Sequence, residues 1–186
     1  MEYGEMLKGI IDELAVNADK VSVDRLEALA DAIYGAKRIF VAGACRAGFA
    51  ARAFALRLMH LGLTVFFVGE PTTPSIGPGD LLVINSGSGE TGSLAVMARR
   101  AKGFGAKLAT ATIHPEATIG SLADVVVPIP GATPKSELAD TVTSIQPMGN
   151  AFEQMSWLCF DVVIMILMDR MHKDAEEMFR LHANLE

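Results

Sequence analysis

From residue 38 to residue 129, the sequence alternates between short apolar segments with strand character and longer helical patterns. The strand-like segments are Arg38–Ala42, Thr64–Val68, Leu81–Asn85, Lys107–Thr112 and Val125–Ile129. The helical patterns are Ala47–Leu61, Thr91 to about Gly103, and a short one suggested at Ser121–Ala123. Strands that alternate with helices form a parallel sheet with right-handed crossovers. The expected fold class is therefore α/β, with five parallel strands flanked by helices.

Helical patterns also flank this region. Residues 5–18 repeat apolar positions at three and four residues, and a second helix is expected at Asp24–Tyr34. A long C-terminal helix is expected from Met148 to about Met171; it is apolar nearly all round after Trp157, so we expect it to be buried. Residues 130–147 hold three prolines and one glycine with no clear period, which predicts a long functional or mobile loop.

The composition of the 186-residue chain narrows the class of protein. Hydrophobic residues make up 51% and charged residues 20%, which indicates a globular protein with one domain spanning residues 1–186. The net charge of −6 argues against a general nucleic-acid binder, which needs a basic face. Because the apolar content is high for a monomer, we expect some surface to be buried between subunits.

Three features favour a cytoplasmic location. The start, Met-Glu-Tyr-Gly-Glu, has neither the basic nor the apolar segment of a signal peptide. The longest apolar run, residues 162–168, is far shorter than the ~20 residues of a membrane span. Cys45 and Cys159 are far apart in the sequence, which excludes a zinc cluster and fits a reducing compartment. We therefore expect no membrane partner and no metal.

The segment 81–91 joins a buried strand to a loop of small residues, Ser-Gly-Ser-Gly-Glu-Thr, at the start of a helical pattern. Backbone N–H groups point outward at a helix N-terminus, where the helix dipole is positive. The hydroxyls of Ser86, Ser88 and Thr91 add three hydrogen-bond donors. We interpret this hydroxyl loop as a phosphate cradle; the alternative is an ordinary turn in which Ser and Thr cap the helix.

A second glycine loop, Gly43–Gly48, follows the first strand. It matches a dinucleotide-binding fingerprint only weakly, because the middle glycine is missing and no acidic residue directly follows the second strand. Arg46 is better explained as a fixed positive charge for a phosphate or a sugar oxygen, the alternative being a solvated surface arginine. For Cys45, a small packed thiol is favoured over a nucleophile, because no base is adjacent in the sequence.

Two glutamates are candidates for function. Glu90 lies inside the hydroxyl loop, where it would repel a phosphate, so we expect it to point toward the sugar or a neighbouring subunit; the alternative is a carboxylate that complements the helix dipole. Glu153 lies among apolar residues one turn into the long helix. Unpaired burial would raise the pKa of its carboxyl, which suits a general base. The alternative is a structural ion pair.

The four histidines are not spaced as a metal pair four residues apart on a helix. His60 lies at a helix end, where a C-cap role is the plain account. His114 precedes a proline in a loop, and His172 lies in a charged stretch. His182, in the C-terminal tail, is expected to be frayed on local sequence alone.

Several segments resemble one known family. The hydroxyl loop resembles the phosphosugar-binding loop of the sugar-isomerase (SIS) superfamily. The segments that resemble the 6-phospho-3-hexuloisomerases are Arg57–Gly62, Ser144–Gly149, Phe152–Gln154 and His182–Glu186. The resemblance covers roughly residues 30–186, and the hydroxyl loop together with Gln-Pro-Met-Gly and His-Ala-Asn-Leu-Glu makes it quite specific.

The resemblance implies a single SIS domain with a flavodoxin-like five-stranded parallel sheet, assembled as a homotetramer with active sites at subunit interfaces. It implies an isomerase that interconverts D-arabino-hex-3-ulose 6-phosphate and fructose 6-phosphate through an enediol, in the ribulose monophosphate route of formaldehyde assimilation. No metal or organic cofactor is implied. Two alternatives stay open: a non-catalytic module that senses a phosphosugar, and an aldose–ketose isomerase for another sugar phosphate.

The resemblance also implies roles for residues. The hydroxyl loop would hold the phosphate through Ser86, Ser88 and Thr91. Glu153 would be the base, and His182 of a neighbouring subunit would be its partner. In related isomerases, residues that match Arg46 and Glu90 also line the site.

The first glycine loop departs from the family, which usually reads Gly-Ala-Gly-Arg-Ser-Gly. Cys45 adds a side chain where a glycine allows close approach, and Ala47 lacks a serine hydroxyl. A hydrogen bond to a charged group contributes about 1.5–3 kcal/mol. We therefore expect substrate binding weakened about tenfold or more rather than lost, with the hydroxyl loop carrying more of it.

Overall fold

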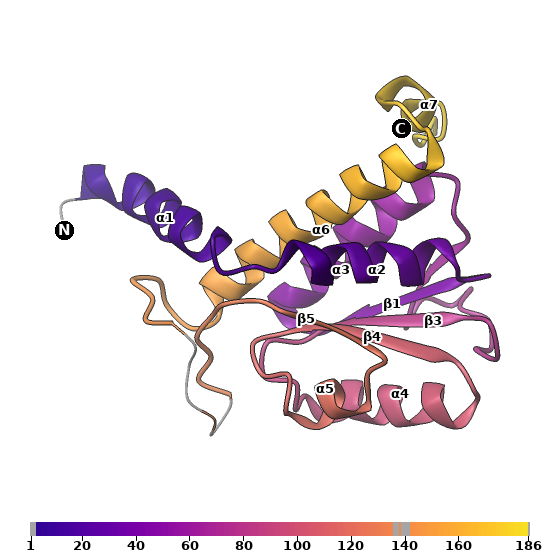
Figure 1. The fold of residues 1–186 in the computed structure, drawn as a ribbon, viewed down its shortest axis with the longest axis horizontal. Coiled ribbons are helices and arrows are strands. Elements are labelled where there is room, and N and C mark those ends of the chain that lie inside the picture. The colour runs from indigo at the N-terminus through magenta and orange to yellow at the C-terminus, as the bar shows by residue number, and fades with distance from the viewer. Residues whose placement is uncertain (1–2, 136–137, 139–141, 186) are drawn as a thin grey trace.

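The computed structural model describes residues 3–135, 138 and 142–185 (Figure 1). Its sheet has five parallel strands in the order β2-β1-β3-β4-β5. They are β1 (Ile39–Gly43), β2 (Val65–Phe67), β3 (Leu81–Asn85), β4 (Lys107–Thr112) and β5 (Val125–Pro128). The strand order reverses between β1 and β3, and open α/β sheets bind ligands outside the strand C-termini at such a reversal.

Helices cover both faces of the sheet and confirm the α/β prediction. The helices α2 (Val23–Tyr34), α3 (Cys45–His60) and α6 (Asn150–Met171) lie on one face, and α4 (Gly92–Gly103) and α5 (Thr118–Leu122) lie on the other (Figure 1). Every residue of β3 is buried, which explains its continuous apolar sequence.

The register brings the two glycine loops together. Gly43, the last residue of β1, pairs with Asn85, the last residue of β3, so the loops that follow these strands start side by side. A Cβ on Gly43 would lie 2.9 Å from the Cα of Gly48, and a Cβ on Gly48 would lie 2.8 Å from the carbonyl oxygen of Gly43. These two glycines therefore let the first turn of α3 pack directly on the end of β1.

The remaining two helices lie at the edges of the molecule. α1 (Tyr3–Ala18) projects away from the sheet, whereas α7 (Ala175–Phe179) lies beyond the end of α6 (Figure 1). In α1, all of which is described, Asn17 is the one buried residue. Large apolar side chains of this helix, such as Leu7 and Ile11, are exposed in the single chain.

The expectation that α6 is buried all round is wrong. Its buried face packs against α2 and α3, but Trp157, Val162 and Met165 on the other face are exposed. An apolar composition does not distinguish a helix buried in its own fold from one that also meets another chain. Among the described helices, α6 is the one that is long and apolar enough to cross a membrane, but half of its most apolar stretch is buried inside this fold.

Some predicted boundaries are also corrected. α3 begins at Cys45 instead of Ala47, and α5 covers Thr118–Leu122 instead of residues 121–123. In the predicted loop at 130–147, residues 136–137 and 139–141 lie outside the described residues.

Candidate active site

A cavity of about 190 Å³ opens at the reversal in strand order, beside the first turns of α3, α4 and α6. Its walls come from both glycine loops, the segment 133–135 and residues 148–153. Pockets for larger organic ligands measure roughly 300–1,000 Å³, so this cavity suits a small molecule. Of the predicted site residues, it brings together Arg46, Ser86, Ser88, Thr91 and Glu153.

The hydroxyl loop presents polar groups to this cavity. Ser86 and Ser88 are buried, and the Ser86 hydroxyl has no hydrogen-bond partner within the described residues. The Ser88 hydroxyl accepts a hydrogen bond of 3.2 Å from the backbone N–H of Glu90. Thr91 is the N-cap of α4, but its side chain makes no capping hydrogen bond. An unpaired buried hydroxyl costs free energy, so the loop has capacity for a polar ligand.

Asn85 is a polar cavity residue that sequence reasoning missed. Its Nδ2 donates hydrogen bonds of 3.0 Å to the Ala47 carbonyl oxygen and to the Ser156 hydroxyl, which ties β3 to α3 and α6. Its Oδ1 lacks a hydrogen-bond partner in the part of the chain that the structure describes. The available signal was one polar residue at the end of a strand that is otherwise entirely apolar.

Arg46 and Glu153 form an ion pair across the cavity wall, between the first turns of α3 and α6. Arg46 Nη1 lies 2.9 Å from Glu153 Oε2, and it also donates a hydrogen bond to the Asn150 side chain. The side chain of Glu153 is 19% exposed and that of Arg46 is 57% exposed. Glu153 is therefore both a member of an ion pair and a carboxylate that lines the cavity.

Glu90 does not line the cavity. Its Oε1 accepts a hydrogen bond of 2.6 Å from the backbone N–H of Thr118, the first residue of α5. This bond and the Thr118 side chain lower the pKa of the Glu90 carboxyl. In the single chain the Glu90 carboxylate thus bonds the start of α5 instead of α4, and its place beside the sugar or a neighbouring subunit stays a prediction.

The prediction of a packed Cys45 thiol is wrong. Cys45 is exposed and lines the cavity, because it is the first residue of α3 at the sharp turn after β1. Its backbone is left-handed, with φ of 52°, a conformation that costs a non-glycine residue about 1–3 kcal/mol.

The Lys135 Nζ donates a hydrogen bond to the Cys45 sulfur at 4.0 Å. Lys135 is a cation at the cavity that the sequence argument did not identify, because a lone lysine in a long loop carries no local signal.

The tail residue His182 lies far from its own Glu153. It lies beyond the C-terminal end of α6, and the 22 residues of that helix span about 33 Å. The tail is not frayed there, because the His182 ring stacks with those of His60 and Phe179.

The prediction that His60 is the C-cap of α3 is also wrong. Leu61 is the C-cap of this helix, and the His60 side chain is buried.

Among the described residues, the other titratable groups add no metal site. His114 is buried at the end of β4, and His172 ends α6 with a left-handed backbone. No group of three or more His, Cys, Asp or Glu residues within the described ranges is arranged to hold a metal ion.

The sequence and the fold have clear relatives. Residues 32–156 match the SIS domain family. The chain is 44% identical over 186 residues to a 3-hexulose-6-phosphate isomerase of Bacillus subtilis, with 100% of both chains covered. It is 43% identical over 175 residues to an enzyme of the same name from Mycobacterium gastri, with 94% of this chain and 87% of the relative covered.

A solved structure leads to the same family. It is a Methanococcus jannaschii protein for which the function of 3-hexulose-6-phosphate isomerase was inferred. Its TM-score to this chain is 0.83 at 33% identity, over 98% of this chain and 99% of the other. The chain therefore belongs to the SIS domain family, and within it to the group that includes the 3-hexulose-6-phosphate isomerases.

Proposed function

We propose that this protein is a 3-hexulose-6-phosphate isomerase, which interconverts D-arabino-hex-3-ulose 6-phosphate and fructose 6-phosphate in the cytoplasm. Support comes from full-length relatives of that name at 43–44% identity. The observation that carries the proposal is that one small cavity holds both a loop suited to a phosphate and a carboxylate in the first turn of α6.

The phosphate is assigned to the hydroxyl loop. Ser86, Ser88 and Thr91 supply hydroxyls at the N-terminus of α4, where backbone dipoles favour an anion. Lys135 supplies a positive charge on another wall of the same cavity. Binding energy from the phosphate then holds the reacting carbons in position, although the phosphate itself does not react.

The chemistry is assigned to Glu153. Its carboxylate takes the proton from C2 of the 3-keto sugar, and the C–H electrons form the C2=C3 double bond while the C3 oxygen gains a proton. The resulting enediol gives up its O2 proton and receives one at C3 from Glu153, which leaves the carbonyl at C2. Arg46 orients the carboxylate through the ion pair of 2.9 Å.

The proton shuttle between the two oxygens is assigned to His182 of a neighbouring copy. Within one chain His182 and Glu153 lie at opposite ends of α6, so this role requires an oligomer with shared sites. An exposed apolar groove of about 460 Å³ between α1, α3 and α6 supports self-association. It lies beside the cavity and is lined by residues that include Leu7, Ile11, Phe49, Trp157 and Leu158. We propose a homotetramer that buries this groove.

Two substitutions separate chemistry from binding. Glu153→Gln keeps the size of the side chain but removes the base, so kcat should fall about 10²–10⁴-fold with little change in KM. Ser86→Ala removes one hydroxyl donor, so KM should rise about tenfold while kcat changes less. The measurement is steady-state kinetics of wild type and variants with fructose 6-phosphate, following the 3-keto product.

Glu27→Gln is the matched control, because Glu27 is exposed on α2 and does not line the cavity. It should have wild-type kinetics. Near-normal turnover of Glu153→Gln would remove Glu153 from the role of base. A wild-type protein that binds fructose 6-phosphate without converting it would identify a sensor instead of an isomerase.

A further inference from the structure

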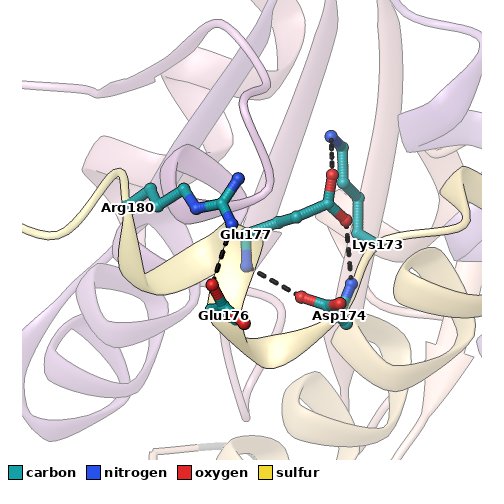
Figure 2. Close-up of polar contacts among 5 residues, drawn as sticks. All are labelled: Lys173, Asp174, Glu176, Glu177 and Arg180. Carbon is teal, nitrogen blue, oxygen red and sulfur yellow. Dashed lines mark hydrogen bonds and ion pairs between the residues drawn. The ribbon is translucent and has the colours of Figure 1, made fainter.

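A capping box marks the start of the short helix at the beginning of the C-terminal tail. At the start of α7, the Asp174 side chain accepts a hydrogen bond of 2.8 Å from the Glu177 N–H, and Glu177 accepts one of 3.2 Å from the Asp174 N–H (Figure 2). Lys173 pairs with Glu177 at 3.0 Å, and Arg180 pairs with Glu176 at 2.8 Å (Figure 2). Since a helix of five residues is not stable alone, these contacts fix where it starts and thus the direction of the residues that follow.

Aromatic rings hold the tail beyond α7 against the end of α3. The His182 ring stacks with the Phe179 ring at 5.8 Å between centroids, and with the His60 ring at 5.3 Å and an angle of 22°. His182 remains exposed, whereas His60 is only 3% exposed. A cavity of about 340 Å³ lies beside these rings, between the end of α3 and the second half of α6. An exposed imidazole is therefore supported by a buried one.

His60 contributes a neutral aromatic face at this position. Burial, with the nearby Arg57 and His182, lowers the pKa of His60. Its Nδ1 lies 3.3 Å from Arg57 Nη1, which can only donate, so the proton of the neutral ring is on Nε2. That Nε2 is buried and has no hydrogen-bond partner among residues 3–135, 138 and 142–185. The neutral His60 ring thus presents a flat face on which the neighbouring His182 imidazole stacks.

We propose that His60 is a positioning residue for the isomerase reaction. Its ring is the platform that orients the His182 imidazole for use by the active site of a neighbouring copy. This inference rests on the role of His182 under the proposed function. It assigns His60 no proton transfer and no contact with the substrate.

The test replaces the ring by an aromatic and by a non-aromatic side chain. His60→Phe keeps a flat face and removes an unsatisfied N–H, which is neutral or stabilising, so kcat should stay within about threefold of wild type. His60→Met has no ring, and the loss of orientation should lower kcat on the order of ten- to a hundredfold. KM should change little in both, because the phosphate site is not touched.

A second readout reports on the stack itself. Stacking shifts the ring-proton NMR resonances of His182, which are assigned by their loss in His182→Asn. The shift should persist in His60→Phe and disappear in His60→Met, while thermal melting shows that both variants are folded. His172→Asn is the matched control, since His172 lies outside the stack and asparagine accepts its left-handed backbone; its kcat should equal that of wild type.

The outcomes separate this inference from the function on which it rests. If His60→Met has wild-type kcat while His182→Asn is inactive, the positioning role of His60 is contradicted and the role of His182 stands. A His60→Phe variant as slow as His60→Met would also overturn the positioning role, because a polar role of His60 would then be required. Wild-type kcat in His182→Asn would instead overturn the proposed role of His182.

Discussion

At the scale of single residues, Cys45 is a natural reporter of the cavity. It is exposed at the first turn of α3, and its sulfur lies 4.0 Å from the Lys135 Nζ at the cavity. Cys159 is the opposite case, because burial raises its pKa to about 11. One chain thus carries an accessible thiol at the proposed site and a buried thiol in the core.

We predict that iodoacetamide at pH 8 alkylates Cys45 and leaves Cys159 unmodified, since only a small fraction of a thiol with a pKa of about 11 is ionised there. Saturating fructose 6-phosphate should slow the alkylation of Cys45 severalfold, because the ligand fills the cavity that this thiol lines. Mass spectrometry of the labelled peptides against time measures both rates. If fructose 6-phosphate leaves the Cys45 rate unchanged, the ligand does not bind in this cavity.

At the residue level, the sequence predicted which side chains share a cavity where the signal was local, while their role in binding phosphate stays a prediction. Ser86, Ser88 and Thr91 are three residues of one short loop, and the structure places that loop at one cavity. The Arg46–Glu153 pair and the place of Lys135 depend on how distant helices and loops pack, and the sequence has no pattern for this. The partner of Glu90 likewise comes from α5, 28 residues away.

At the scale of elements, the turn before β3 fixes the strand that leads to the hydroxyl loop. Buried Asp80 accepts hydrogen bonds from Arg38 Nε at 2.9 Å, Arg38 Nη2 at 2.6 Å and the Gly77 N–H at 2.8 Å. Arg38 directly precedes β1, and Asp80 directly precedes β3. The pair thus joins the N-terminal ends of the two strands between which the order reverses.

The bond to Arg38, together with the Gly77 N–H and the nearby Lys37, holds the pKa of Asp80 below its usual range. A depressed folded-state pKa stabilises the protein above the unfolded pKa of about 4, and this stabilisation is lost as pH falls through the folded value. Asp80→Asn should therefore lower the free energy of unfolding by about 1–3 kcal/mol at pH 7. The difference from wild type should shrink steadily below about pH 4.

Urea unfolding followed by circular dichroism at several pH values measures this difference. Asp12→Asn, at an exposed position of α1, should show no such trend. A difference for Asp80→Asn that stays constant from pH 7 to the lowest pH at which the protein folds would show that the carboxylate charge does not stabilise the turn.

The strands were predicted well, because buried parallel strands are continuous apolar runs. The bounds of β3 and β4 agree with the prediction, and β1 differs by one residue at each end. The exposed face of α6 was not predicted, because the apolar pattern of a helix does not say whether its own fold or another chain covers it. The short α5 was misplaced, since five residues give no helical period.

At the scale of the whole molecule, the proposed catalytic groups lie at opposite ends of one helix. Glu153 is in the first turn of α6, and His182 follows α7. α7 lies beyond the far end of α6 (Figure 1). The resemblance of the tail to a known family suggested a role across subunits, but local sequence did not place it. From Glu153 to Met171, the last residue of α6, the helix rises about 27 Å, and this separation within one chain gives the cross-subunit role a geometric reason.

The central claim is that a complete active site combines Glu153 of one copy with His182 of another. The most direct test mixes the inactive variants Glu153→Gln and His182→Asn, dissociates them and lets them reassemble. A hybrid pair then has one site with both groups intact and one site with neither. Random pairing should restore roughly a quarter of wild-type kcat, measured with fructose 6-phosphate. If hybrids form, as native mass spectrometry can show, and the mixture stays inactive, the two groups do not belong to a site shared between copies.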